Sequence, residues 1–365
     1  MATTQIPWTT GGGNITLTYT GQGNGTITVR SSDNYLTENR SQIITVSGGG
    51  ITRQVTVTQE ANAYAQQYLT FVARESSSFT LTRNAVQYSL DGGNTWTTLA
   101  ADTASPTIAV GSKIMWKGNL TPATNQGIGK FKSDGTFDVE GNIMSLLYGS
   151  NFRNQYSLEG KSNAFQSLFN SSKVVNAENL VLPATTLSSV CYQSMFAMST
   201  YLQKAPKVLP AEVCTEYCYD GMFAGCHSLV YTPMICATTL ANYCFSYMFW
   251  ECTSLVYAPR IIATSLASNC CAYMFKNCTS LTTSPILYAT TLVSGCYTQM
   301  FYGCTNLNIV YGLFTTTPDS SSTANWLYGV AANGMFYKNQ NATWSVSGAD
   351  GIPSGWHIRN YSEDE

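Results

Sequence analysis

Cysteines are the residues of this chain with the clearest capacity for chemistry. All twelve lie between Cys191 and Cys304, many of them eight or eighteen residues apart. Thiolates in this number could bind zinc or pair as disulfides. Zinc sites need closely spaced pairs, and the chain contains no C-x-x-C pair. Reduced thiols packed in a core, a few disulfides and a metal site remain as alternatives, and the spacing favours the core thiols. The densest group is Cys244, Cys252, Cys270, Cys271 and Cys278.

Other groups that could support catalysis are few and scattered. The two histidines, His227 and His357, stand in no nucleophile or metal motif. Carboxylates near the cysteines do not recur at one register, whereas a glycosidase needs two of them about 5–9 Å apart. The glycine-rich stretches "GQGNG" and "GIGK" lack the context of a phosphate loop. We therefore expect a protein that is not an enzyme, with no catalytic residue, no bound metal and no cofactor.

A repeat explains the spacing of the cysteines. A Met-Phe pair recurs at intervals of 27, 26, 26 and 26 residues, and weaker copies end at Phe169 and Phe336. A period in this range is typical of leucine-rich repeats, in which each unit buries its apolar face against its neighbours. The repeat predicts a solenoid whose phenylalanines stack. They are Phe196, Phe223, Phe249, Phe275 and Phe301.

Each unit can be numbered from its phenylalanine, taken as position 0. Leucine recurs at position +6, proline at +10 and cysteine at −5, and "ATTL" or "ATSL" precedes the next unit. Cysteine also recurs at +3, and the whole pattern predicts inward, packed side chains. A serine at a buried +3 position should then lower the free energy of unfolding more than an alanine does, because its hydroxyl would be buried without a hydrogen-bond partner. The +3 cysteines are Cys226, Cys252, Cys278 and Cys304.

The unit "MFxxCTSLxxxPxIxATTLxxxCYxxMF" resembles the BspA-like leucine-rich repeat. The resemblance implies a solenoid of short strands joined by short helices or turns, with about six units of 26–27 residues over 161–311. This chain departs from the family by having cysteine where an inward isoleucine is usual. Its units are also about three residues longer and carry an added proline.

Two β-sandwich-like modules are expected before the solenoid. Residues 1–63 alternate Ile, Val and Thr between glycine-rich turns, which is typical of half-buried strands. The end of this segment, "RQVTVTQEA", with Asn34 and Arg40 before it, resembles the BACON domain, a small β-sandwich. Residues 64–160 again read as strands and include "SLDGGNTW", an Asp-box pattern that predicts a tight hairpin at 89–96.

The segment 312–365 is expected to cap the last repeat. A solenoid's terminal unit would otherwise expose its core. Four large aromatic side chains are available to cover it, and the final "SEDE" is expected to be a solvated tail. The four are Trp326, Phe336, Trp344 and Trp356.

Aromatic side chains at the variable positions of the repeat are the binding candidates. Their flat faces, among threonine hydroxyls and asparagine amides, suit sugar rings or a partner protein. Stacking for stability is the alternative interpretation of the same ladders. The candidates are Trp250, Tyr257, Tyr302, Tyr231, Tyr247 and Tyr273.

Composition and resemblance together set the expected function. Only 10% of residues are charged and the net charge is −2, so no basic face indicates binding to nucleic acid or an anionic membrane. The first residues, "MATTQIPWTTGGGN", lack the pattern of a secretory signal, and no apolar stretch approaches a membrane span. We therefore expect a chain made in a bacterial cytoplasm that does not insert into membranes.

The 64–160 block and the C-terminal tail, "WLYGVAANGMFYKNQNATWSVSGADGIPSGWHI", resemble proteins of crAss-like Bacteroides bacteriophages. That resemblance implies a virion protein, a head fibre or a tail-associated fibre. Its N-terminal modules would bind capsid or tail proteins, its repeats would adhere to host-surface or mucus glycans or proteins, and three chains would form a homotrimer. A BspA-like adhesin on the bacterial cell surface is the alternative, although it requires export, and a glycan-active enzyme is the least favoured.

Overall fold

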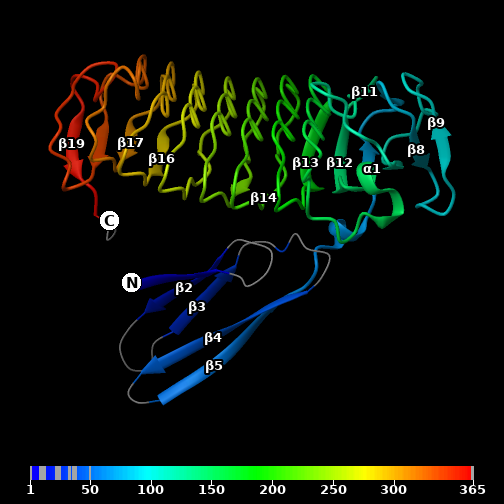
Figure 1. Ribbon diagram of the computed structural model, residues 1–365, viewed down its shortest axis with the longest axis horizontal. Helices are drawn as coiled ribbons and strands as arrows, with labels where there is room; N and C mark the ends of the chain where they lie inside the picture. The colour runs from blue at the N-terminus through cyan, green and yellow to red at the C-terminus, as the bar shows by residue number, and fades with distance from the viewer. Residues whose placement is uncertain are drawn as a thin grey trace.

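The computed structural model describes residues 2–7, 14–20, 26–31, 34, 39–48 and 51–362. Figure 1 shows a long solenoid of stacked coils, with the N-terminal strands lying to one side of it. Helix in the described segments amounts to one turn of α-helix, α1 (Ser145–Tyr148), and two 3₁₀ turns, η1 (Ala63–Gln66) and η2 (Gly149–Asn151). The mainly β fold with a solenoid of about six turns is therefore confirmed. Within the described residues no helix is long and apolar enough to span a bilayer.

The N-terminal strands form a three-stranded antiparallel sheet and a separate hairpin around a small core of Ile15, Leu17 and Ile44. The two residues noted in the BACON resemblance both contact the end of the hairpin. The Asn34 amide donates to the Glu60 carbonyl at 2.9 Å, and Arg40 Nε donates to Gln59 Oε1 at 2.9 Å. A sandwich architecture for 1–63 and 64–160 stays a prediction. The strands are β1 (Ala2–Pro7), β2 (Asn14–Thr20) and β3 (Thr26–Ser31), with β4 (Arg40–Gly48) and β5 (Ile51–Gln59) in the hairpin.

The next block of strands is joined directly to the solenoid. Its main sheet has six strands in the order β13-β12-β6-β10-β8-β9, and β11 and β7 form a smaller antiparallel pair. Strand β13 belongs to the first coil and pairs in parallel with β12, so one sheet crosses the expected boundary near residue 160. The bounds are β6 (Leu69–Ala73), β7 (Phe79–Leu81), β8 (Val86–Ser89), β9 (Thr97–Leu99), β10 (Lys113–Lys117), β11 (Phe131–Ser133), β12 (Phe137–Asn142) and β13 (Val174–Val181).

The Asp-box hairpin forms where the sequence predicts it, between β8 and β9. The Asp91 carboxylate accepts the Thr95 amide at 2.9 Å and the Thr95 hydroxyl at 2.6 Å, and these hydrogen bonds hold the pKa of Asp91 well below its usual range. Gly92 and Gly93 supply the positive φ angles that the turn needs. Half-buried Trp96 packs edge-on against Tyr68, with ring centroids 4.7 Å apart.

In the solenoid, the phenylalanines at position 0 form a continuous stack. Neighbouring rings are nearly parallel, with centroids 5.5 Å apart from Phe223 to Phe249 and again from Phe249 to Phe275. The five repeat phenylalanines and four +3 cysteines of the predicted core are all fully buried. Short parallel strands or single bridges follow each phenylalanine. They include β14 (Val208–Leu209), β15 (Met234–Ile235), β16 (Thr283–Leu287) and β17 (Ile309–Gly312).

The opposite part of each coil is a run of turns, which we call the turn ladder. At positions −6, −2 and +2 the backbone has positive φ in every unit from Phe169 to Phe301, as at Val190, Ser194 and Met198. Alternate amides donate to the next coil, such as Phe196 N to the Met222 carbonyl at 2.8 Å. The amides between them close local turns, such as Met195 N to the Tyr192 carbonyl at 3.2 Å. Every rung is therefore fixed both within and between coils.

The C-terminal segment both covers and extends the solenoid. Strands β18 (Met335–Lys338) and β19 (His357–Asn360) continue the parallel sheet begun by β16 and β17. The four expected capping aromatics are all buried. The tryptophans among them also donate hydrogen bonds from their indole N–H groups. Trp326 donates to the Gly351 carbonyl at 2.8 Å and Trp344 to the Phe314 carbonyl at 3.0 Å.

Candidate functional site

The cysteines of the repeat lie inside the solenoid. All twelve are buried and none is in a disulfide. Among the described residues no three His, Cys, Asp or Glu side chains are grouped so that they could hold a metal ion. The +3 thiols donate to the phenylalanine carbonyl of the preceding coil, as Cys252 Sγ does to the Phe223 oxygen at 3.2 Å. These thiols are part of the packing between coils.

The six aromatic candidates do not form one site. Tyr231 and Tyr257 lie at position +8, in the parallel ladder that starts the strand part of each coil. The other four lie in or beside the turn ladder, on the other side of the phenylalanine stack. Sequence offsets gave the register of each residue but not the side of the coil to which it points. The strand part of the coils, from β12 to β19, is called the strand face below.

The turn-ladder aromatics are engaged with one another. Tyr247 and Tyr273 stack with ring centroids 4.4 Å apart and an angle of 5° between their planes. Tyr302 stacks on Tyr328 at 5.0 Å, and the Lys276 ammonium lies 4.8 Å from the centre of the Tyr302 ring. Trp250 is half-buried and meets Tyr247 edge-on at 6.2 Å. For these four residues the geometry favours the alternative of stacking for stability.

Tyr231 and Tyr257 have a different environment. They are 62% and 74% exposed, the highest values among the large apolar and aromatic side chains at the surface of the solenoid coils. They occupy the same position in consecutive coils. The Lys204 ammonium, one coil earlier in the ladder, lies 5.4 Å from the centre of the Tyr231 ring. Two accessible aromatic faces beside a cation therefore mark the middle of the strand face.

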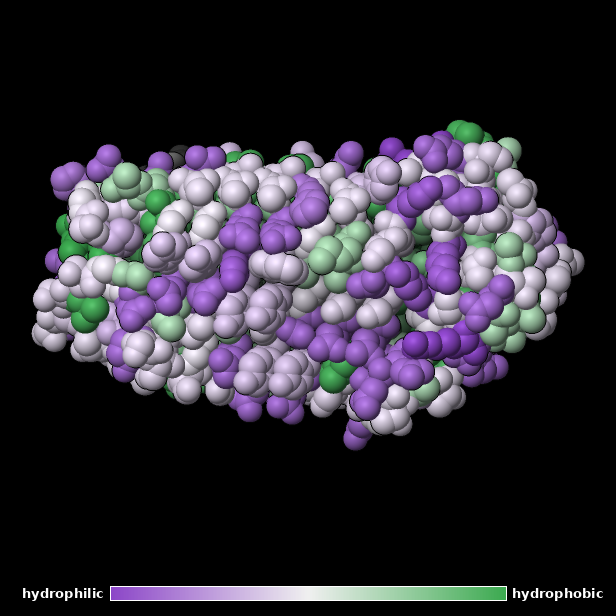
Figure 2. Space-filling model, turned by 90° about the horizontal axis from the view of Figure 1, so that it is seen from above, coloured by the Kyte–Doolittle hydropathy of each residue, from purple (hydrophilic) through white to green (hydrophobic). Residues whose placement is uncertain are grey.

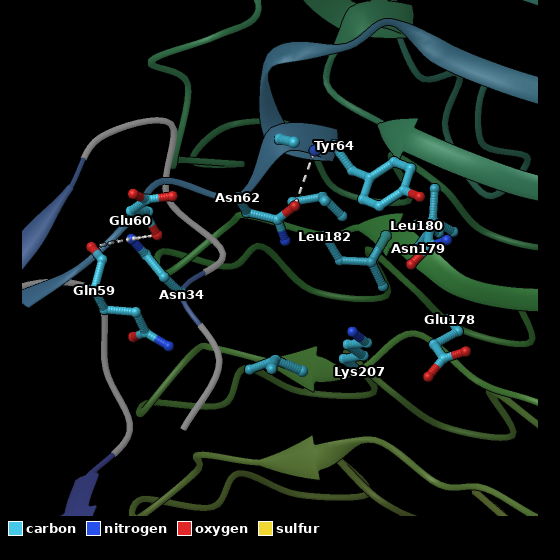
Figure 3. Close-up of a pocket in the computed structure, with 13 residues that line it drawn as sticks. Asn34, Gln59, Glu60, Asn62, Tyr64, Glu178, Asn179, Leu180, Leu182 and Lys207 are labelled. Atoms are coloured by element: carbon cyan, nitrogen blue, oxygen red, sulfur yellow. Dashed lines mark hydrogen bonds between the residues drawn. The ribbon is translucent and has the colours of Figure 1, made fainter. Parts of the chain in front are cut away.

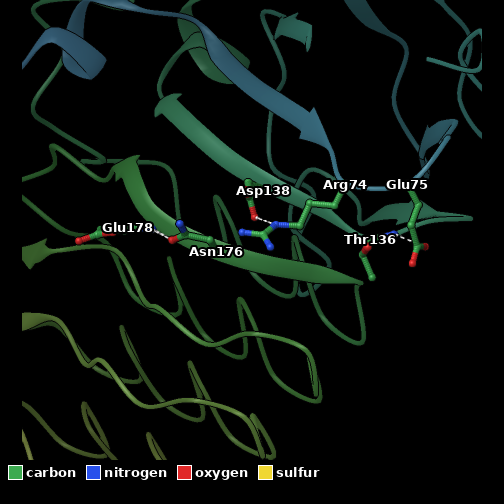
Figure 4. A network of polar contacts seen from close by, with 6 residues as sticks. All are labelled: Arg74, Glu75, Thr136, Asp138, Asn176 and Glu178. Carbon is green, nitrogen blue, oxygen red and sulfur yellow. Dashed lines mark hydrogen bonds and ion pairs between the residues drawn. The ribbon is translucent and has the colours of Figure 1, made fainter. Parts of the chain in front are cut away.

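Charged pairs occupy the N-terminal end of the strand face, and Figure 4 shows the pair Arg74 and Asp138. Arg74 Nε donates to Asp138 at 2.7 Å, and Lys204 Nζ contacts Glu178 at 2.9 Å. The hydrogen bond and charge of Lys204 lower the pKa of Glu178, and Glu178 in return raises the pKa of Lys204. The Glu178 carboxylate is therefore stabilised in its charged form by Lys204. The face changes from charged at β12 and β13 to aromatic at Tyr231 and Tyr257.

A carboxyl that acts as a general acid can be sought by the direction of its pKa shift. Such a group needs a carboxyl pKa raised toward neutrality. In the part of the chain that the structure describes, the carboxyl with a raised pKa is Asp220, and the cause is burial. It lies in the turn ladder, where the Gln193 amide donates to it at 2.8 Å, away from the charged pairs.

A cavity of about 280 Å³ lies where the N-terminal segment meets the first coils (Figure 3). Its walls come from the end of β5, from η1 and from β13, and include Asn62, Tyr64 and Glu178. The Asn62 side chain accepts from the Tyr64 amide at 2.9 Å and so caps η1. Most of the residues that line this cavity belong to the junction between the N-terminal segment and the first coils.

The outer surface is polar and mixed. Seen from above, hydrophobic residues form only small scattered patches among polar ones (Figure 2). The charged share of the chain is low, so hydroxyl and amide groups make up much of this polarity. Such a surface suits contacts through hydrogen bonds and isolated aromatic rings.

No family model matches the chain, and no curated protein and no solved structure shows significant similarity to it. The resemblances noted in the sequence therefore rest on the quoted motifs alone.

Proposed function

We propose that this protein is a non-enzymatic virion fibre protein that adheres to host-surface or mucus glycans through the strand face of its solenoid. The observation that carries the adhesive part is the pair Tyr231 and Tyr257, which present accessible rings at the same position of consecutive coils. Sugar rings stack on such aromatic faces, and neighbouring polar groups bond their hydroxyls. The parallel ladder fixes the backbone at both positions, so the spacing of the two rings is set before a glycan binds.

The fibre part of the proposal rests on the phage resemblance and on the shape of the molecule. An elongated solenoid with a separate N-terminal part suits a particle-bound fibre (Figure 1). Val29, Ile43 and Val55 in the N-terminal strands expose 40%, 55% and 52% of their surface. Apolar groups of this kind support attachment to capsid or tail proteins or to two further copies of the chain.

The adhesive proposal is tested with mucin and a glycan array. Replacing both Tyr231 and Tyr257 by Ala should weaken glycan binding about thirtyfold, if each ring contributes about 1 kcal/mol. The melting temperature should change little, because both side chains are exposed. Measurements should use the assembled protein, since several chains per fibre would raise a weak affinity by avidity.

Tyr201→Ala provides the matched control. Tyr201 is 51% exposed and stands at position +5, outside the strand ladder. This variant should bind glycans like the unchanged protein. Equal binding by the Tyr231/Tyr257 double variant would instead remove the strand face as the adhesive site.

The virion assignment has its own test. Mass spectrometry of purified phage particles should detect the chain, and light scattering should give the mass of a trimer. Detection only in the outer surface of bacterial cells would favour the alternative of a cell-surface adhesin. Degradation of any polysaccharide by the pure protein would contradict the assignment as a non-enzyme.

A further inference from the structure

A second polar cavity lies at the N-terminal end of the solenoid, apart from the strand face. It measures about 470 Å³, within the usual range for small-molecule sites. Its walls come from the segment after β7, from the loop before β11 and from the first coil. The residues that line it are almost all polar: Thr82, Arg83, Asp102, Asn125, Gln126, Gly129, Lys130, Gln166 and Ser167.

The charges around this cavity are unbalanced. The lining contains two cations, Arg83 and Lys130, and one carboxylate, Asp102, and none of the three forms an ion pair within the described residues. Arg83 is held in place because its guanidinium donates to the Gln126 carbonyl at 2.6 Å. Partial burial lowers the pKa of Lys130, and the neighbouring Lys132 lowers it further. Lys130 Nζ contacts the neutral Asn170 Oδ1, at 3.4 Å, so an anion in the cavity would add a charged partner for both cations.

Neutral groups add acceptors and donors to the same cavity. The Gln166 amide nitrogen donates to Gln193 in the next coil at 2.7 Å, and that amide donates onward to Asp220. This chain of hydrogen bonds fixes the Gln166 side chain and leaves its buried Oε1 with no partner among the described residues. This oxygen is closed to solvent, so the hydrogen-bonded amides hold the wall of the cavity in place and do not offer Oε1 to a ligand.

The backbone around the cavity is also unusual. Four of its non-glycine residues have positive φ: 73° at Arg83, 55° at Asp102, 60° at Asn125 and 55° at Ser167. Ser167 belongs to the regular turn ladder, but the other three come from separate loops. Strained residues of this kind cluster at ligand sites, where surrounding contacts hold them in place.

We propose that this cavity binds a carboxylated sugar, such as a uronic acid residue. The sugar carboxylate would lie between Arg83 and Lys130, and its hydroxyls would donate to Asp102. A bare phosphate fits less well, because it would leave most of the 470 Å³ empty. The site is independent of the glycan contact proposed for Tyr231 and Tyr257.

The test is a titration of the full chain with glucuronic acid, followed by calorimetry or saturation-transfer NMR. We expect binding on the order of 1 mM and at least about tenfold weaker binding of glucose, which lacks the carboxylate. Lys130→Met and Arg83→Gln should each weaken glucuronate binding by about tenfold, because each removes a charged hydrogen bond. Lys132→Met is the control, because Lys132 is exposed in β11, two residues beyond Lys130, and does not line the cavity.

The outcomes separate the possibilities. Binding by the Lys132→Met and Tyr231→Ala/Tyr257→Ala variants should stay within about twofold of the unchanged protein, since none of these side chains lines the cavity. Equal affinity for glucose and glucuronate would overturn the proposal. So would an unchanged affinity in the Lys130→Met and Arg83→Gln variants, or tighter binding of inorganic phosphate, which would indicate a bare anion site. Melting curves establish that each variant is folded.

Discussion

At the scale of single residues, the +3 position shows how a thiol takes part in joining coils. Cys226, Cys252, Cys278 and Cys304 donate to phenylalanine carbonyls at 2.9–3.2 Å. In an earlier coil the same position is Ser199, whose hydroxyl donates to the Phe169 carbonyl at 2.6 Å. The expectation that a serine here would lack a partner is therefore wrong, because the carbonyl is already in place.

The order of two substitutions at Cys252 follows. Cys252→Ser should retain the hydrogen bond to Phe223, whereas Cys252→Ala should lose it and leave a small void worth about 1 kcal/mol. Urea unfolding of both variants measures the difference in the free energy of unfolding. A serine variant less stable than the alanine variant would show that the site cannot accept the shorter C–O bond.

The tyrosines show what a repeat can and cannot predict about residues. Periodicity alone gave the stacked phenylalanines and the buried cysteines, because each recurs at a fixed offset. It did not separate Tyr257 on the strand face from Tyr247 in the turn ladder. That distinction depends on where the chain reverses direction within a coil, and the family resemblance left the strand register open.

At the scale of elements, the turn ladder is the feature that the sequence analysis missed. Its positive φ angles fall on Tyr217, Tyr243 and Val190 as well as on glycines, and bulky residues seldom adopt them. The sequence contains a signal for these positive φ angles. Positions −6 and +2 of one unit are Asn269 and Asn277, and asparagine adopts positive φ more often than most residues. Stacking of Tyr217 on Tyr243, with centroids 4.8 Å apart, helps to offset the strain.

Val190 should therefore be a weak point of this ladder. It is β-branched with φ of 64°, whereas Asn163 and Asn269 hold the same position in other coils. Val190→Asn should stabilise the protein by about 1 kcal/mol, because asparagine tolerates this conformation. Thermal unfolding measures the change.

Gly295→Ala tests the same −6 position by a change in the opposite direction. Gly295 has φ of 66°, and an added Cβ would lie 2.0 Å from Asn269 Oδ1. This variant should be less stable than the unchanged protein by more than the strain of about 1 kcal/mol alone.

The Val190 prediction has its own contradicting outcome. A Val190→Asn variant that is destabilised would show that the valine packing outweighs its backbone strain.

At the scale of the whole molecule, one core runs through most of the chain. A single cluster of buried residues extends from Leu69 in β6 to Trp356 before β19. Pairing between β12 and β13 carries the sheet across the junction as well. Sequence could not predict this continuity, because strand pairing over more than thirty residues leaves no local pattern. Unfolding from Leu69 onward should therefore be cooperative.

This core is sensitive to alkaline pH. Burial raises the pKa of Cys296 and Cys304 from an ordinary value of 9.0 to about 12, and it also raises the pKa of Tyr219 and Tyr297. A thiol whose pKa is raised by folding keeps its proton in the folded state, while the unfolded chain loses it above pH 9. Its contribution to stability is therefore complete below pH 9 and is lost as the pH rises toward 12.

We predict a steep loss of stability from pH 9 upward. Each thiol of this kind should remove about 1.4 kcal/mol per pH unit, so Cys296 and Cys304 together should cost about 3 kcal/mol at pH 10. Urea unfolding at pH 8, 9, 10 and 10.5, with a reductant present, measures the slope. Cys304→Ala should make that slope shallower by one titrating group, although the variant starts from a lower stability at pH 8. A free energy of unfolding that stays constant from pH 8 to 10.5 would mean that these thiols reach solvent in the folded protein, contrary to their burial.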